Sequence, residues 1–71
     1  MRVEITDQVV EQLADVLATG EIADPVNWMG VQSVAFDRGH DELVEFIVEA
    51  DASTYYEALQ MAEEQAEDAE V

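Results

Sequence analysis

Helix-stopping residues divide this chain into short segments, and this constrains its fold more than any other feature. Thr19-Gly20, Asp24-Pro25 and Gly39 each interrupt a run in which apolar side chains recur every three or four positions. That spacing places the apolar side chains on one face of a helix. A chain of 71 residues supports a single domain. The sequence therefore predicts an all-α domain, a compact bundle of three to four short helices.

Caps and stops mark the first two helices. Thr6 is expected to cap the first helix, and Gly20 favours the left-handed conformation that ends it. Asn27 is expected to cap the second helix, which continues to about Arg38 before Gly39 stops it. The apolar residues predicted for the inner faces are Val9, Val10, Leu13, Ala14, Val16 and Leu17 in the first helix, and Met29, Val31, Val34, Ala35 and Phe36 in the second.

Two further helices are predicted after Gly39. The third begins at about His40-Asp41, and Ser53 is expected to cap the fourth. Because adjacent residues of a helix point about 100° apart, only one of Tyr55 and Tyr56 is expected to face the core. The predicted inner-face residues are Leu43, Val44, Phe46, Ile47 and Val48 in the third helix, and Tyr55, Tyr56, Leu59, Met61 and Ala62 in the fourth.

Both ends of the chain are expected to lie outside the bundle. Residues 1–5 alternate apolar and polar, but with no second strand to pair with they are predicted to form an extended arm. Residues 63–71 carry five acids near the negative end of a helix dipole and have little apolar surface to bury. We therefore expect a domain over residues 1–62 and an acidic, frayed tail over 63–71.

The chain is strongly acidic. Eighteen Asp and Glu residues face two arginines, Arg2 and Arg38, and the formal net charge is −16. The acids are spread along the whole chain and lysine is absent, which favours adaptation to molar salt, where the Debye length is about 3 Å. A dedicated acidic face and ordinary acidity are the alternatives. The composition resembles that of proteins from halophilic archaea or their viruses, which implies a cytoplasmic protein in a high-salt cytosol.

No catalytic, cofactor or metal motif is present. His40 is the only imidazole, and its combination with Asp24, Asp37 or Asp41 lacks a defining ligand spacing. Non-specific association of cations with the acids is expected instead. A general acid needs a cleft and a perturbed pKa, and abundant carboxylates by themselves supply neither. The chain is therefore predicted to be non-enzymatic, with no cofactor and no metal site.

Direct binding to DNA or to a membrane is not expected either. The second and third predicted helices have the outline of a helix-turn-helix, but the third carries Asp41, Glu42, Glu45 and Glu49 and no base. No apolar run approaches the roughly 20 residues that span a bilayer. The sign of the charge does fit an acidic nucleic-acid mimic that inhibits a DNA- or RNA-binding protein, and this is the alternative function.

Aromatic and sulfur-containing side chains suggest a protein-binding surface instead. Trp28 and Met29 stand together at a predicted helix start, where they can form an interface hot spot or, in the case of Trp28, close one end of the core. One of Tyr55 and Tyr56 is expected to face solvent or a partner. Small cores often gain stability by oligomerising. The predicted function is therefore a small accessory or regulatory protein that acts by protein–protein contact, as a homodimer or with another protein.

A set of short segments resembles a family of small uncharacterised phage and prophage proteins. The matching features are the Thr19-Gly20 turn, V-Q-x-x-A at 31–35, Gly39, L-V-x-F-I at 43–47, and Tyr55 or Tyr56. The match departs in the connector, where the Asn-Met pair of the family directly follows the T-G turn. Here Asn27-Trp28-Met29 lies later and contains an additional tryptophan. The resemblance implies a fold and a viral origin, and it implies no site.

Salt adaptation predicts a steep dependence of stability on ionic strength. Raising KCl from about 0.1 M toward molar concentration should increase both helix content and melting temperature, because screening weakens the repulsion among the carboxylates. Circular dichroism at each salt concentration measures both quantities. A melting temperature that is the same in dilute buffer and in molar KCl would contradict salt adaptation.

Overall fold

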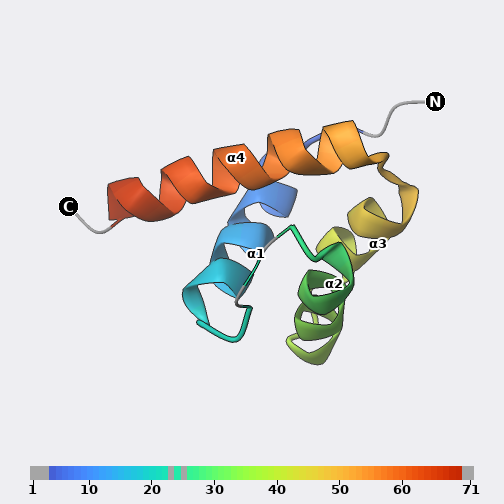
Figure 1. Cartoon of the computed structure of the whole chain (residues 1–71), viewed down its shortest axis with the longest axis horizontal. Coiled ribbons are helices and arrows are strands. Elements are labelled where there is room, and N and C mark those ends of the chain that lie inside the picture. Colours follow the sequence, from blue (N-terminus) through green and yellow to red (C-terminus); the bar gives the residue numbers. More distant parts are fainter. Residues whose placement is uncertain (1–3, 23, 25, 70–71) are drawn as a thin grey trace.

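Four helices follow one another along the chain. The computed structural model describes residues 4–22, 24 and 26–69, with side chains as far as Gln65. The helices are α1 (Asp7–Ala18), α2 (Trp28–Asp37), α3 (Asp41–Glu49) and α4 (Ala52–Ala69), and those described ranges contain no strand (Figure 1). The predicted all-α class, with four helices in a small bundle, is confirmed.

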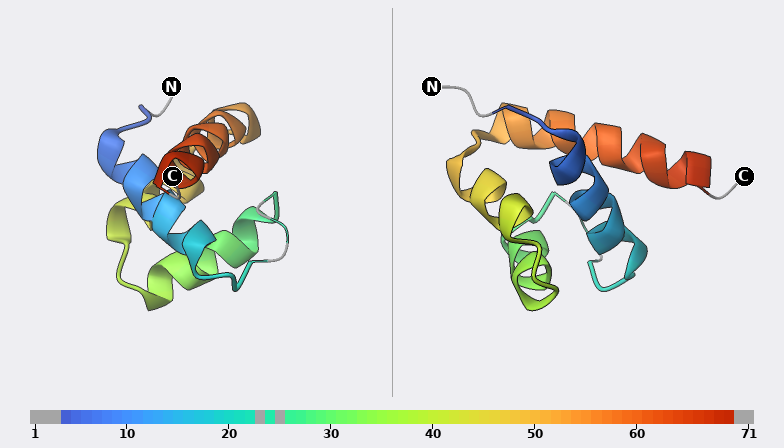
Figure 2. Two further views of the ribbon diagram at one scale, coloured as in Figure 1. Left: turned by 90° about the vertical axis from the view of Figure 1, so that its left-hand side faces the viewer. Right: turned by 180° about the vertical axis from the view of Figure 1, so that it is seen from behind.

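The longest helix, α4, lies across the other three (Figure 1). The helix α1 is central, since it packs against α4, α3 and α2, whereas α2 packs mainly on α3. The C-terminal turns of α4 extend past α1 (Figure 2), and the molecule measures 37 × 22 × 19 Å along its principal axes. α4 is therefore held chiefly by α1.

The core lies where α1 meets the inner faces of the other helices. Thr54, at the start of α4, is buried among the apolar residues. The buried apolar residues are Val9, Val10, Leu13, Val16, Val31, Ala35, Leu43, Phe46, Ile47, Tyr55, Ala58, Leu59 and Ala62.

The N-cap predicted for α1 and the glycine turns predicted after α1 and α2 are confirmed. The Thr6 side chain accepts a hydrogen bond of 3.2 Å from the backbone N–H of Val9. Gly20 and Gly39 both have positive φ, 73° and 75°. After α2, the N–H of His40 donates to the carbonyl of Ala35 at 2.9 Å and the N–H of Gly39 donates to Phe36 at 3.1 Å. This pair of bonds is a Schellman motif, and it fixes the turn between α2 and α3.

The predicted caps of the later helices need correction. Ser53 does not cap α4; it lies in the first turn of the helix, and the carboxylate of Asp51 accepts a 2.9 Å hydrogen bond from the Thr54 N–H. Asp51 is an equally good cap, and Ala50 before it is already extended, so the helix begins two residues earlier than expected. Asn27 holds the N-cap position of α2 but makes no side-chain cap bond.

Several apolar residues predicted for inner faces are exposed. Phe36 is 72% exposed and Val48 67%, while Met29, Tyr56 and Met61 also face outward. In α2, Val31 and Ala35 are four residues apart and take the inward face. Phe36 follows Ala35 directly and is turned about 100° away from it, so it cannot share that face.

The chain ends differ in part from expectation. Residues 63–69 continue α4 as a helix, so the boundary predicted after Ala62 is not a break in secondary structure; residues 70–71 lie outside the described part of the chain. Of the predicted arm, residues 1–3 are also outside it. Glu4 and Ile5 have no regular secondary structure, and Ile5 packs against the core.

Polar side chains on one edge of α1 hold the turn between α2 and α3. The Gln12 side-chain oxygen accepts a 2.9 Å hydrogen bond from the N–H of Leu43, in the first turn of α3. One turn later, the carboxylate of Asp15 accepts from Nε of Arg38 at 2.9 Å and lies 2.7 Å from Nε2 of His40. An ionised carboxylate only accepts hydrogen bonds, so Nε2 of His40 carries the proton. Gln12 thus caps α3 from another helix, and Asp15 holds the residues just before α3.

These contacts lower the pKa of Asp15 below its ordinary value of 3.8, chiefly through the hydrogen bond from His40 and then through that from Arg38. Folding therefore favours the ionised carboxyl group. Its stabilising effect is present above about pH 3.8 and is lost as the pH falls through the lowered pKa. The effect is modest, because the Asp15 and Arg38 side chains are both more than 40% exposed.

The substitution Asp15→Asn should lower the free energy of unfolding at neutral pH. The difference in this free energy between the variant and the unsubstituted protein should become smaller below about pH 3.8. Urea unfolding across this pH range measures the difference. Glu11→Gln is the matched control, because it removes one exposed negative charge from the same helix. If Glu11→Gln destabilises the protein as much as Asp15→Asn, the contacts with Arg38 and His40 do not stabilise the turn.

Candidate functional site

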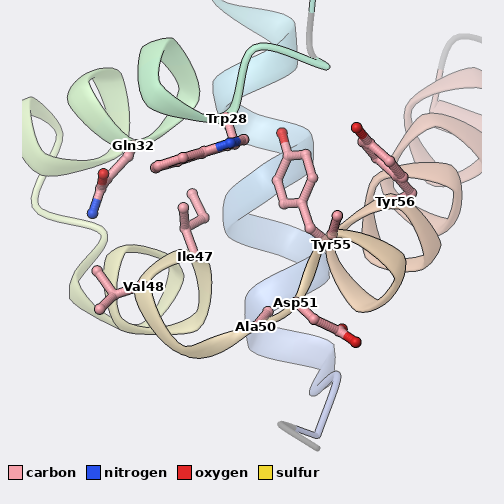
Figure 3. A pocket seen from close by; sticks show the side chains of 9 residues that line it. Trp28, Gln32, Ile47, Val48, Ala50, Asp51, Tyr55 and Tyr56 are labelled. Carbon is pink, nitrogen blue, oxygen red and sulfur yellow. The ribbon is translucent and has the colours of Figure 1, made fainter.

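A hollow of about 430 Å³ lies where the start of α2 faces the joint between α3 and α4 (Figure 3). Ala50 leaves α3 with an extended backbone and Asp51 starts α4, so the end of one helix and the start of the next form adjoining walls. Trp28 stands opposite, in the first turn of α2. The lining residues are Trp28, Gln32, Ile47, Val48, Ala50, Asp51, Ala52, Tyr55 and Tyr56. We call this the Trp28 hollow.

Three aromatic rings surround the Trp28 hollow. Tyr55 is 3% exposed, whereas Trp28 is 48% and Tyr56 46% exposed. The two tyrosine rings have centroids 5.9 Å apart and planes tilted by 60°. Burial, with smaller contributions from Tyr56 and Glu63, raises the pKa of Tyr55 to about 12, so its hydroxyl is neutral at physiological pH. The expectation that one tyrosine faces the core and the other faces outward is confirmed.

Among the described residues of the lining, the only charged group is an acid. Asp51 contributes its carboxylate, which also caps α4, and Gln32 contributes an amide. Among the described residues that line the hollow, none carries a positive charge. The hollow therefore combines aromatic and aliphatic walls with one negative group.

A second, shallower hollow of about 280 Å³ adjoins the first along α2. Gln32 lines both, and the second is further lined by Met29, Ser33, Phe36, Asp37 and Val44. Exposed apolar side chains thus follow α2 from one hollow to the other. We define the α2 apolar surface as the exposed residues Trp28, Met29, Phe36, Val48 and Tyr56.

The structure brings together three of the four residues predicted for protein binding. Trp28, Tyr55 and Tyr56 line one hollow, while Met29 lines the neighbouring one. Tyr55 forms buried wall and offers little surface of its own.

Phe36 and Val48 belong to the exposed surface, although the apolar periodicity of the sequence predicts inner-face positions for both. The sequence of α2 does contain a signal for such exposure, because its apolar residues lie on more than one side of the helix. A helix in a small bundle can bury only one of those sides.

The observed side-chain partner of His40 is Asp15, whereas Asp24, Asp37 and Asp41 are the acids that a metal site at His40 would have required. Within residues 4–22, 24 and 26–69, no three His, Cys, Asp or Glu side chains gather as a metal site would require. The same part of the chain holds no helix with the length and apolar character needed to cross a membrane.

Comparison with known protein families, with curated proteins and with solved structures finds no significant match to this chain.

Adjacent tyrosines allow a matched test of which side chain supports the core. Tyr55→Ala should destabilise the protein by about 3–5 kcal/mol, because it removes a buried ring, whereas Tyr56→Ala should cost less than about 1 kcal/mol. Chemical denaturation in high salt, where the parent protein is expected to be most stable, measures both values. Equal losses for the two variants would contradict the observed burial.

Proposed function

We propose that this protein acts without catalysis, as a small accessory or regulatory protein whose α2 apolar surface binds another protein. The supporting observation is that Trp28, Met29, Phe36, Val48 and Tyr56 are each between 46% and 72% exposed and lie along two adjoining hollows. Isolated exposed apolar residues are common on soluble proteins, but continuous groups of them mark interaction sites. Tryptophan, tyrosine, phenylalanine and methionine are also enriched in interfaces.

The partner we propose is a second copy of this chain. The net charge of −16 makes most contacts between copies repulsive, but the helices differ in how much charge they carry. The ten residues of α2 include one acid, Asp37. By contrast, α1 carries three acids and α3 carries four in similar lengths. Two copies that meet through α2 therefore bring together the least charge and the most exposed apolar surface.

A high-salt cytosol is the environment in which this contact would be strongest. Screening over a Debye length of about 3 Å at 1 M salt weakens repulsion between the acidic faces of the two copies. The apolar contact itself does not depend on opposite charges, so salt does not weaken it. Ionic strength should thus promote both folding and association.

The predicted homodimer can be tested with a single substitution in α2. In molar KCl, light scattering should give twice the 7.9 kDa mass of the chain, and Phe36→Ser should give the mass of one chain. Phe36 is the most exposed member of the α2 apolar surface, so its replacement should leave the core intact. Far-ultraviolet circular dichroism checks that the variant is folded.

Met61→Ser is the matched control. Met61 is also exposed, at 43%, but it lies on α4 and lines neither hollow. The Met61 variant should keep the mass of a dimer. A strict monomer before substitution, or equal loss of the dimer in both variants, would rule out self-association through α2.

Nucleic-acid mimicry is the second candidate function, and a different face supports it. Glu4, Glu42, Glu45 and Glu49 line a small groove between α3 and the N-terminal segment, and no described residue in that lining is a cation. Anions presented in this way resemble a phosphate backbone in charge. The two functions differ in the residues they require, since mimicry would be lost on neutralising these glutamates and would survive Phe36→Ser.

A further inference from the structure

We propose that the Trp28 hollow binds an alkylated ammonium head group, that is, an organic cation such as a quaternary amine. This is a second binding activity, at the end of α2 that faces α4, and it shares Trp28, Val48 and Tyr56 with the α2 apolar surface. The proposal rests on the size of the hollow, on the aromatic rings around it and on the sign of the charge in its wall.

The size suits a small organic molecule. Ligand sites of proteins typically enclose about 300–1,000 Å³ and are lined mostly by apolar and aromatic side chains with few polar groups. The Trp28 hollow encloses about 430 Å³, and among the described lining residues only Gln32 and Asp51 carry a polar amide or a charge. A bare metal ion would leave most of this volume empty and would find one carboxylate.

The rings provide the surfaces that attract such a cation. The faces of tryptophan and tyrosine carry negative electrostatic potential, and quaternary ammonium groups are bound among such rings. Tyr56 and Trp28 are about half exposed and present the accessible ring surface, while the buried ring of Tyr55 lies 5.9 Å from that of Tyr56, tilted by 60° to it, and supports it from behind. Trp28 projects from α2 on the other side of the hollow (Figure 3). The rings thus come from two separate helices and flank the same space.

Charge favours a cation over a neutral or anionic ligand. Asp51 is part of the wall, where its carboxylate also accepts the cap bond from Thr54, and no described residue of the lining is positive. An alkylated ammonium group should bind better than a primary one. A primary ammonium such as that of lysine is strongly hydrated and carries three N–H donors that would need acceptors. The walls are largely apolar and offer few such acceptors. A head group without N–H donors matches these walls better.

Choline and its uncharged carbon isostere, which has a tert-butyl group in place of trimethylammonium, separate the effect of charge from that of shape. Trp28 is the only tryptophan, so its fluorescence reports binding directly. At constant high ionic strength, choline should quench or shift this fluorescence saturably. Its affinity should be at least roughly fivefold higher than that of the isostere, because cation–π attraction is added to the apolar contact.

Three variants test the walls. Asp51→Asn removes the charge and keeps the helix cap, since asparagine caps as well as aspartate, and it should weaken choline binding several-fold. Tyr56→Leu should also weaken binding, whereas Tyr56→Phe keeps the aromatic face and should preserve it. Glu64→Gln is the charge control, because Glu64 is an exposed acid of the same helix outside the hollow. It should leave the affinity unchanged.

The two sources of such a head group are distinguished by a second probe, a short peptide that contains trimethyl-lysine. Tighter binding of the peptide identifies a modified protein side chain as the ligand, and equal or weaker binding identifies a free small molecule. Equal affinity for choline and its isostere, no saturable response to either probe, or equal effects of Asp51→Asn and Glu64→Gln would each overturn the proposal. Trp28, Val48 and Tyr56 belong to both the hollow and the α2 apolar surface, so a dimer would cover the hollow. Choline binding is therefore measured on Phe36→Ser as well, because this variant keeps every lining residue of the Trp28 hollow, and failure of one proposal can then be told from failure of the other.

Discussion

The attachment of the α2–α3 turn to α1 is the contact on which the rest of this structure depends. Helices of ten and nine residues are too short to be stable alone in water. Gln12 and Asp15, one turn apart on α1, hold the first turn of α3 and the two side chains before it. The Schellman motif at Gly39 in turn fixes α2 relative to α3. One polar edge of α1 therefore positions both short helices, and the buried apolar residues then stabilise that arrangement.

Once α2 is fixed in this way, its outward face is determined. Val31 and Ala35 point into the core, so the remaining apolar side chains of the helix have no place to be buried. The start of α2 also comes to lie opposite the α3–α4 joint, and this produces the Trp28 hollow. The α2 apolar surface and the Trp28 hollow therefore both result from the way α2 packs against α1 and α3. They also share Trp28, Val48 and Tyr56, so both depend on the same placement of α2 against α3 and α4.

Local sequence signals predicted the helices well because their causes are local. The Thr6 cap and the positive φ of Gly20 and Gly39 depend on residues only a few positions away. The start of α4 was misplaced because Asp51 and Ser53 are both competent caps, and only the observed bond to Thr54 distinguishes them. The partner of Gln12 is 31 positions away, so periodicity could not reveal it. Residue type alone identifies Trp28 and the tyrosines as candidates for binding. Their position around one hollow depends on tertiary packing, so periodicity could not reveal it either.

The acidity of the chain and the selectivity proposed for the Trp28 hollow would act over different distances. In molar salt the field of the exposed carboxylates extends only about 3 Å, and inorganic cations associate with them in large excess. The net charge of −16 therefore attracts cations without distinguishing among them. Within the hollow, the aromatic walls and Asp51 act at contact distance, where screening is weaker because little solvent intervenes. Strongly hydrated inorganic ions gain little from aromatic faces, whereas an alkylated ammonium loses little hydration on entry. If the proposed binding holds, discrimination between cations belongs to Trp28 and Tyr56, whereas salt adaptation predicts that the acidic exterior serves the solvent and not a ligand.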